Sequence, residues 1–186
     1  MTQLSRHRLS GASLIEMLVA TLLLAVGLLA MASLQASSTQ LGKDAEYRAI
    51  ASELALGFGE AVKANAGGAA TYNNAQNNFV LPAPPVNLLT NCSDLAAACT
   101  NAQVAQQDMS QFLALARARL PNGQARIVYV AGAGNAPSFI DLWVAWLPTD
   151  TRTGDGAVDN QLANGCPAGF DGGNVGARCQ YFRISP

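Results

Sequence analysis

Histidine and charged side chains are scarce in this chain of 186 residues. His7 is the only histidine, and Asp, Glu, Lys and Arg together make up 12% of the sequence. The sequence also contains no G-x-S-x-G, no H-E-x-x-H and no glycine-rich phosphate-binding loop, so the usual nucleophile–base pairs are missing. An enzyme is therefore the poorest of the function classes. Asp141 is the best carboxylate candidate, and it has no second acid at a fixed spacing.

Clusters of basic side chains are lacking as well. Beyond residue 11 the only close pair of basic residues is Arg117 with Arg119. A surface that binds nucleic acid needs a patch of Lys and Arg, so the composition disfavours nucleic acid as a partner. Over the same residues nine Lys and Arg stand against twelve Asp and Glu, which gives a net charge of about −3.

The four cysteines form two close pairs in the sequence. Cys92 lies near Cys99, and Cys166 lies near Cys179. Four cysteines allow three disulfide connectivities, and the short intervening loops favour the sequential pairing in an oxidising compartment. A zinc site is the alternative, but these spacings lack the tight pattern of zinc knuckles. We therefore expect two disulfides, no metal and no cofactor.

One long apolar run, Ala12–Leu34, stands out against this background. Its 23 residues contain a single charge, at Glu16, and no proline. As a helix they would extend about 34 Å, enough to cross the hydrocarbon core of a bilayer. Because Arg6 and Arg8 precede the run, the positive-inside rule predicts a cytoplasmic N-terminus and a C-terminal domain on the far side of the membrane.

Neither a signal peptide nor a plain membrane anchor accounts for this run fully. A signal peptide usually has an apolar core of roughly 7 to 15 residues and a small-residue cleavage site, and the sequence fits neither. A plain anchor leaves Glu16 unexplained, because a carboxylate in hydrocarbon costs about 2.5 to 3.5 kcal/mol on insertion scales. The sequence therefore predicts that Glu16 has a partner.

The segment Gly11-Ala12-Ser13-Leu14-Ile15-Glu16 resembles the class III signal of type IV pilins and type II secretion pseudopilins. The resemblance implies that a prepilin peptidase cleaves after Gly11 and methylates Ala12. It also implies that Glu16 pairs with the amino group of a neighbouring subunit in a filament. Three regions follow, which are a leader at 1–11, a transmembrane and filament-core helix at 12–34, and a periplasmic head at 35–186.

The polar segment after the apolar run keeps a helical pattern. Its apolar positions repeat every four residues, at Ile50, Leu54, Phe58 and Val62. One helix is therefore expected to continue to about Ala64 and to end at Ala66-Gly67-Gly68. Residues 69–100, rich in Asn and Pro, are predicted to form a long connecting loop.

A second helix is predicted from its cap at Thr100 to about Leu120. Asp108 is expected near the boundary of its polar face, and Arg117 and Arg119 suit its C-terminal end as solvated side chains. A catalytic role for these charges is the less favoured alternative.

The remaining apolar runs predict strands at Arg126–Val130, Phe139–Trp146 and Gln180–Ile184, the first two as a hairpin. In the second strand one face should cover the helix, and it comprises Ile140, Leu142, Val144 and Trp146. The other face should point to solvent or a partner, and it comprises Phe139, Asp141, Trp143 and Ala145. Trp143 is interpreted either as covered by a loop or as an interface anchor.

The glycine-rich segment before the last strand contains three acidic residues. Asp150, Asp155 and Asp159 are interpreted as solvated turn residues, with calcium ligands as the less favoured alternative. In pilins a disulfide-closed C-terminal loop of this kind would be similar to the D-region. The resemblance as a whole predicts the type IV pilin fold. In this α+β fold a long N-terminal helix packs on a small antiparallel sheet, with a second helix in the connecting loop.

Three functions compete, namely a pilin-like filament subunit, a membrane-anchored periplasmic enzyme and a pseudopilin. The second helix region also resembles PilV-type minor pilins, on Cys92, Cys99, Thr100, Asp108, Phe112, Leu120, Pro121 and Gly123. We therefore predict a minor pilin that helps initiate type IV pilus assembly at or near the tip. A minor pseudopilin of a type II secretion system is the alternative.

The resemblance also implies where the chain resides and what it contacts. The implied partners are other minor pilins, the major pilin, the prepilin peptidase, the inner-membrane assembly platform and a tip adhesin. The chain would first cross the inner membrane once, with its head in the periplasm, and would then join an extracellular pilus. The expected activity is assembly, without bond chemistry performed by the chain itself.

Overall fold

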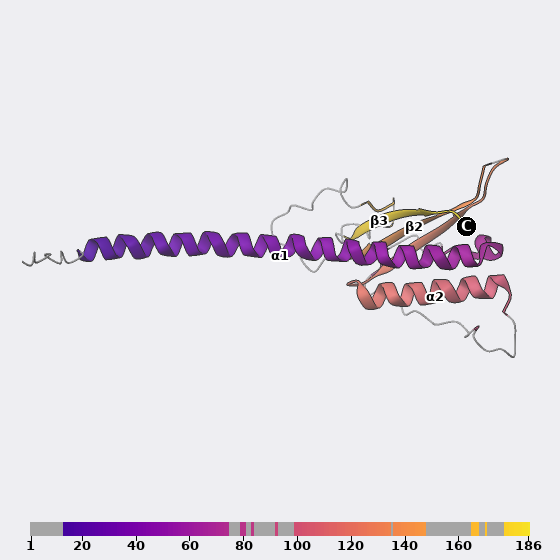
Figure 1. The fold of residues 1–186 in the computed structure, drawn as a ribbon, viewed down its shortest axis with the longest axis horizontal. Helices are drawn as coiled ribbons and strands as arrows, with labels where there is room; N and C mark the ends of the chain where they lie inside the picture. Colours follow the sequence, from indigo (N-terminus) through magenta and orange to yellow (C-terminus); the bar gives the residue numbers. More distant parts are fainter. Residues whose placement is uncertain are drawn as a thin grey trace, which may run out of the picture. The chain divides into compact units, whose positions relative to one another are not determined.

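The computed structural model describes residues 13–74, 79–80, 83, 92, 99–134, 136–147, 165–167, 170 and 177–186. Its elements, in chain order, are α1 (Leu14–Ala64), η1 (Ala66–Thr71), α2 (Asn101–Arg119), β1 (Gln124–Val130), β2 (Phe139–Trp146) and β3 (Arg178–Ile184) (Figure 1). The predicted α+β class is confirmed. Contacts within the chain divide it into two units, Met1–Lys43 and Asp44–Pro186, which are described separately below.

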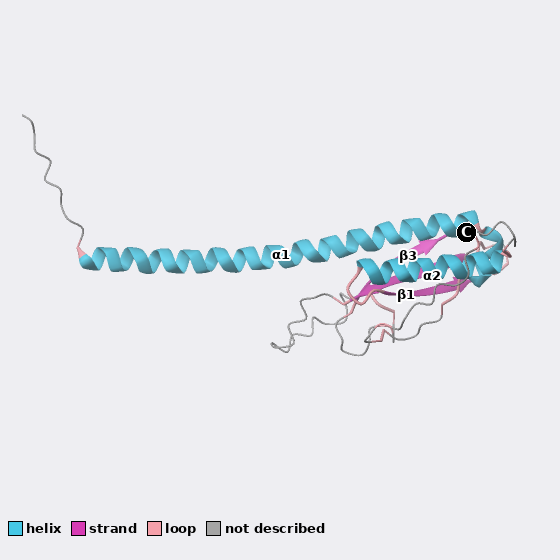
Figure 2. Ribbon diagram, turned by 90° about the horizontal axis from the view of Figure 1, so that it is seen from below, coloured by secondary structure: helices cyan, strands magenta, loops and turns pink. Residues whose placement is uncertain are grey.

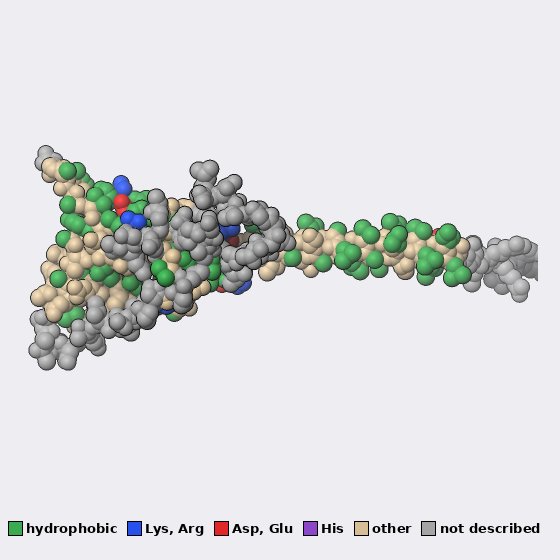
Figure 3. All heavy atoms as spheres, turned by 180° about the vertical axis from the view of Figure 1, so that it is seen from behind, with side chains coloured by type: hydrophobic (Ala, Val, Ile, Leu, Met, Phe, Trp, Pro, Cys, Tyr) green, Lys and Arg blue, Asp and Glu red, His purple; other side chains and the backbone are tan. Residues whose placement is uncertain are grey.

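The first unit contains the apolar half of α1. No proline interrupts it, and helix-forming Leu and Ala dominate its sequence, so its backbone hydrogen bonds continue without a break. Every side chain described between Ser13 and Lys43 is exposed, including Leu14 at 85%. In Figure 3 the green hydrophobic side chains of this segment stand along the helix. The described part of this unit therefore has no core of its own.

The second unit, which we call the head, begins with the amphipathic half of α1. Leu54, Phe58 and Val62 are buried, as their spacing predicts, and Ile50 packs against the same cluster. The small residues Ala51 and Ala55 are buried as well, and they widen the apolar stripe beyond the one read from large side chains. The helix ends at Ala64, as predicted. The expected loop begins instead with the short 3-10 helix η1.

The second helix follows its sequence signals closely. Thr100 caps α2 and forms a capping box with Gln103, in which each side chain accepts from the other residue's backbone N–H. The helix stops before Pro121, where Asn122 adopts a left-handed φ of 51°. A Cβ on Gly123 would lie 2.1 Å from the carbonyl oxygen of Ala116, so this turn requires glycine.

The sheet is antiparallel, with strand order β1-β2-β3. The hairpin of β1 and β2 is confirmed, and β1 and β3 each begin two residues before the predicted start, at Gln124 and Arg178. One face of the sheet, here called the inner face, packs against α1 and α2 (Figure 2). The predicted inner residues of β2 are fully buried there, namely Ile140, Leu142, Val144 and Trp146.

The opposite face of the sheet, here called the outer face, differs from its prediction at one position. Ala145 is fully buried, because Phe79, Phe170 and Cys179 form a second apolar cluster over this end of β2. Loop residues that carry no periodic pattern supply this cover, which explains why the strand pattern could not reveal it. The other residues of β2 on this face are only partly buried.

The described parts of the connecting loop are fixed to the edge of β1. The side chain of Gln124 exchanges two hydrogen bonds with the backbone of Val80, and Asn74 forms an isolated bridge with Ile127. These contacts replace part of the strand partner that an edge strand lacks. The three acidic residues weighed as calcium ligands, Asp150, Asp155 and Asp159, lie outside the described residues.

Candidate functional site

The carboxylate of Glu16 lies in the first turn of α1. The backbone N–H groups of Glu16 and Met17 both donate to the carbonyl oxygen of Ser13, at 2.9 and 3.2 Å. Gly11 and Ala12, the residues implied in processing, lie outside the described residues. Glu16 itself is exposed, and no ion pair joins it to the described residues.

The first-turn position changes the energetic argument about Glu16. The N-terminal end of a helix carries a partial positive charge that favours a nearby carboxylate. The insertion cost of about 2.5 to 3.5 kcal/mol applies to a charge at the helix centre, and side chains near a helix end can reach the polar interface. Glu16 therefore costs less in a membrane than the sequence argument assumed, and its predicted partner is supported by the motif rather than by that cost.

The apolar half of α1 meets the physical requirements of a membrane span. It belongs to the one helix among the described residues that is long and apolar enough to cross a bilayer, with a mean hydropathy of 2.5 in its most apolar window. A signal sequence near an N-terminus satisfies the same criterion. Leu and Val side chains point outward on all sides, so the segment needs lipid or neighbouring helices around it.

All four cysteines form disulfides in the structure. Cys92 is joined to Cys99, and Cys166 is joined to Cys179. These are the sequential pairs that the spacing favoured, and both lie in the head. Structural disulfides persist in oxidising compartments, so the head has the character of an extracytoplasmic domain.

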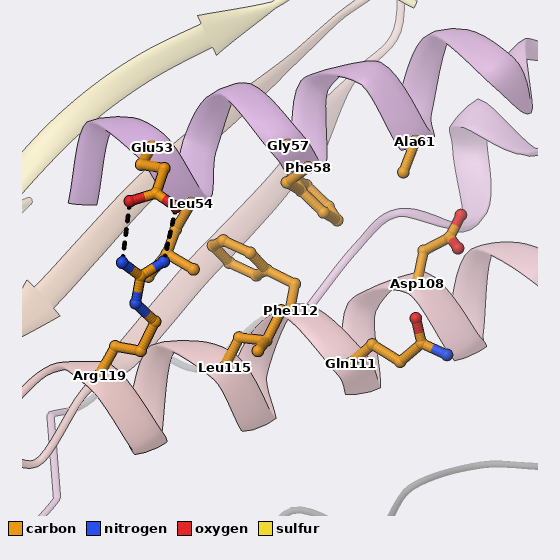
Figure 4. A pocket seen from close by; sticks show the side chains of 10 residues that line it. All are labelled: Glu53, Leu54, Gly57, Phe58, Ala61, Asp108, Gln111, Phe112, Leu115 and Arg119. Carbon is orange, nitrogen blue, oxygen red and sulfur yellow. Dashed lines mark hydrogen bonds and ion pairs between the residues drawn. The ribbon is translucent and has the colours of Figure 1, made fainter. Parts of the chain in front are cut away.

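A groove lies between α1 and α2 on the head surface (Figure 4). We call it the α1–α2 groove, and its volume is about 260 Å³. Its floor is apolar because Phe58 and Phe112 stack across the two helices, with ring centroids 4.6 Å apart. The ten lining residues are Glu53, Leu54, Gly57, Phe58, Ala61, Asp108, Gln111, Phe112, Leu115 and Arg119.

An ion pair closes one end of the groove. The guanidinium of Arg119 donates two hydrogen bonds to the carboxylate of Glu53, at 2.8 and 2.9 Å. The hydrogen bond and the positive charge of Arg119 lower the pKa of Glu53 below its usual value. Arg119 is exposed, as predicted for a solvated side chain, and it also links the C-terminal end of α2 to α1.

Asp108 lies at the other end of the groove. The sequence predicted its place near the boundary of the polar face of α2, but not the buried hydroxyl that donates to it. The hydroxyl of Tyr72 donates to Oδ2 of Asp108 at 2.5 Å, and the amide of Asn65 donates to the Tyr72 oxygen at 3.2 Å. Tyr72 is fully buried. Burial first, and then the hydrogen bond to Asp108, raise the pKa of Tyr72 well above its usual value.

The outer face of the sheet collects aromatic and charged side chains. Asp141 accepts from the Tyr181 hydroxyl at 2.6 Å and from Nε of Arg183 at 3.0 Å. Asp141 lies on the outer face, as predicted, and its carboxylate is engaged there by neighbours on β3. Trp143 is partly buried, with its ring 5.1 Å from that of Tyr181 and the guanidinium of Arg126 5.8 Å from its centroid.

The groove and its two polar ends could not be read from the sequence. Glu53 and Arg119 are 66 residues apart, and Tyr72 and Asp108 are 36 residues apart, so no local spacing joins them. Asp108 and Arg119 were noticed as charges on a helix, but their partners lie on α1 and just after η1. Only the packing of α2 against α1 brings these residues together.

The structure agrees with a pilin-like arrangement at the level of architecture. A long apolar N-terminal helix is followed by a small antiparallel sheet packed against helices. No family model, no curated protein and no solved structure matches the chain.

Proposed function

We propose that this chain is a minor pilin that helps to initiate type IV pilus assembly and sits at or near the pilus tip. One observation carries the proposal. A helix with a fully exposed apolar half begins directly after the segment Gly11-Ala12-Ser13 and bears Glu16 in its first turn. A soluble domain would bury such a surface, whereas a filament subunit exchanges it between lipid and neighbouring helices.

In the proposed mechanism, the apolar half of α1 exchanges its contacts with lipid for contacts with neighbouring helices in the filament. Cleavage after Gly11 would expose the amino group of Ala12, while α1 remains in the membrane. Helices associate in lipid through packing and polar contacts, because lipid tails are as apolar as the helices themselves. The contact between Glu16 and the amino group of a neighbour would therefore contribute strongly to the order in which subunits join.

The role as a minor rather than a major subunit depends on the head. The resemblance to PilV-type minor pilins spans the first disulfide, α2 and the turn after it, from Cys92 to Gly123. In the structure this region supplies the cap of α2, the groove and the glycine turn. The partners proposed for it are other minor pilins, the major pilin and a tip adhesin. The peptidase and the assembly platform would act on the N-terminal segment.

A substitution at Glu16 tests the assembly role. We expect Glu16→Gln to leave membrane insertion unchanged but to lower recovery of the chain in filaments sheared from cells. The drop should be about tenfold or more, as the loss of a charge-assisted contact of about 1.5 to 3 kcal/mol implies. Thr21→Ala is the matched control, because Thr21 lies on the same helix and its hydroxyl donates, within the described part of the chain, to the carbonyl of Leu18.

Wild-type recovery of the Glu16→Gln chain in sheared filaments would contradict the proposed role of this carboxylate. Recovery of the chain only with a secretion apparatus, and never with surface filaments, would instead support the minor pseudopilin. Because the control and the variant are compared in the same fractions, a general loss of expression does not mimic either result.

A further inference from the structure

Two surfaces of the head each carry a charge that the described chain leaves unpaired. In the α1–α2 groove, Asp108 accepts from Tyr72 but forms no ion pair within the described residues. On the outer face, Arg126 likewise forms no ion pair there, and its Nε is buried without an acceptor. Among the described residues, Asp108 and Arg126 are therefore charges of opposite sign that form no ion pair.

The neighbouring charges of both surfaces are already neutralised. Arg119 is paired with Glu53 in the groove, and Arg183 is paired with Asp141 on the outer face. Arg117 also has no ion pair in the described part of the chain, but it is not among the residues that line the groove. The charge complementarity between the two surfaces therefore involves one residue on each, Asp108 in the groove and Arg126 on the outer face.

The shapes of the two surfaces match as well. The groove has an apolar floor, and Gly57 leaves its α1 wall without a side chain (Figure 4). Its volume of about 260 Å³ is large enough to admit one aromatic side chain. The outer face presents Tyr181, 43% exposed, beside Trp143. An aromatic ring entering the groove would meet the rings of the floor at the tilted or offset geometry that aromatic pairs favour.

These surfaces cannot meet within one molecule. The groove is formed by the helices that cover the inner face of the sheet, whereas Trp143 and Arg126 lie on its outer face. Between two copies they can meet, and such a contact is heterologous, because each copy uses a different surface. A heterologous contact between two copies leaves one of the two surfaces of each copy free for a further subunit.

We propose that the outer face of one head docks into the α1–α2 groove of a second copy of this chain. Tyr181 enters the groove, and the guanidinium of Arg126 approaches the carboxylate of Asp108. The proposal rests on the proposed function in one respect, because it takes the chain to be a subunit that meets its own copies at a membrane or in a filament. A phosphate-rich partner is disfavoured, since the outer face offers one unpaired cation and the chain has a net charge of −1.

Photo-crosslinking in native membranes tests this contact on the full chain. The substitution Tyr181→p-benzoylphenylalanine places a photoreactive benzophenone at the position that is proposed to enter the groove. We expect ultraviolet light to produce a dimer of two copies, and peptide mapping to locate the link on the groove between Gln111 and Leu115. A link to any other protein, a link mapped elsewhere on the second copy, or no link at all would overturn the proposal.

A groove-filling variant sharpens the experiment. A Cβ on Gly57 meets no atom within 4 Å, so Gly57→Leu fills the groove without forcing its backbone to move. Gly42→Leu is the matched control, because Gly42 is exposed on the same helix and equally open. We expect Gly57→Leu to lower dimer yield at least about tenfold, as the loss of an aromatic anchor does at interfaces, and Gly42→Leu to leave it unchanged.

Two differently tagged copies test the heterologous geometry. A copy that carries both the crosslinker and Gly57→Leu should still crosslink to a copy with an open groove, since it donates only its outer face. A copy that carries the crosslinker and an open groove should not crosslink to a second copy that carries Gly57→Leu. Crosslinking that survives when the acceptor carries Gly57→Leu would overturn the proposal.

Charge removal completes the test. Asp108→Asn keeps an oxygen that can accept from Tyr72 but removes the charge, and it should reduce the crosslinked dimer as Arg126→Gln does. Undiminished dimer in both variants would contradict the assigned charge pair. Failure here is distinguishable from failure of the proposed function, because incorporation into filaments depends on Glu16 and is measured separately.

Discussion

At the scale of single residues, the head is organised by a few polar side chains that reach across elements. Tyr72 connects the end of η1 to Asp108 on α2, and Asn65 connects the end of α1 to the carbonyl oxygen of Asn101. These groups are buried or partly buried, where an unpaired polar atom is costly. The sequence reveals the residues but not their partners, because hydrogen bonding across 36 residues depends on the packing of the helices.

Removing the Tyr72 hydroxyl should destabilise the head. We expect Tyr72→Phe to lower the free energy of unfolding by about 1.5 to 3 kcal/mol, the value of a hydrogen bond to a charged group. Both tryptophans lie on β2, so fluorescence during denaturation reports unfolding of the head alone. Tyr129→Phe is the control, because no hydrogen bond joins the Tyr129 hydroxyl to the described residues. Equal stability of the two variants would refute this role of Tyr72.

The same tyrosine should make stability fall in alkali. The folded head raises the pKa of Tyr72 above the ordinary value of 10.0, so above about pH 10 the unfolded chain loses this proton while the folded chain keeps it. The unfolded state then binds fewer protons, and the free energy of unfolding decreases as the pH rises. We expect a steeper decrease between pH 9 and 11, roughly the range around an ordinary tyrosine pKa, in the wild type than in Tyr72→Phe. Parallel curves would contradict the assigned shift.

At the scale of elements, the sequence predicts α1, α2 and all three strands because each has a strong periodic pattern or a clear cap. The apolar spacing from Ile50 to Val62, the Thr100 cap and the alternation in β2 each agree with the structure. The signal fails where contacts with loops decide the outcome. Ala145 is buried by Phe79 and Phe170, and neither of these residues lies in a patterned segment.

Replacing either of two glycines by alanine should change the stability of the head, and the two changes should have opposite signs. Gly57 lies within α1 with open space at its Cβ position, so Gly57→Ala should stabilise the head by up to about 1 kcal/mol through helix propensity. At Gly123 the added methyl group would clash with the backbone of Ala116, and Gly123→Ala should destabilise it by about 1 to 3 kcal/mol. Chemical denaturation followed by tryptophan fluorescence measures both. Shifts of the same sign would contradict the described turn.

At the scale of the whole molecule, the two units differ in what holds them. The first unit, up to Lys43, has only exposed side chains in its described part, whereas the head has a core and both disulfides. The sequence predicts this difference between the two units, since it shows both the long apolar run and the two pairs of cysteines. The surfaces proposed for docking could not be predicted, because the groove exists only when α1 and α2 are packed.

The two disulfides should contribute unequally to the head. Cys166 and Cys179 close a loop of 13 residues and pack with Phe170, whereas Cys92 and Cys99 are separated by 7. Replacing Cys166 and Cys179 together by alanine should cost about 2 to 4 kcal/mol of unfolding free energy, and replacing the other pair should cost less. Denaturation of the oxidised chains in detergent measures both. A larger loss from the Cys92 and Cys99 pair would contradict this ranking.

The central claim is that the chain is processed and then transferred from membrane to filament. Intact-mass measurement of the chain in sheared surface filaments tests it most directly, with a Gly11→Ala chain as the control. We predict a wild-type species that begins at Ala12 and carries one N-terminal methyl group, and no Gly11→Ala chain in the filaments. A chain that retains residues 1–11 in the filaments, or one that is cleaved but never leaves the membrane fraction, would contradict the account.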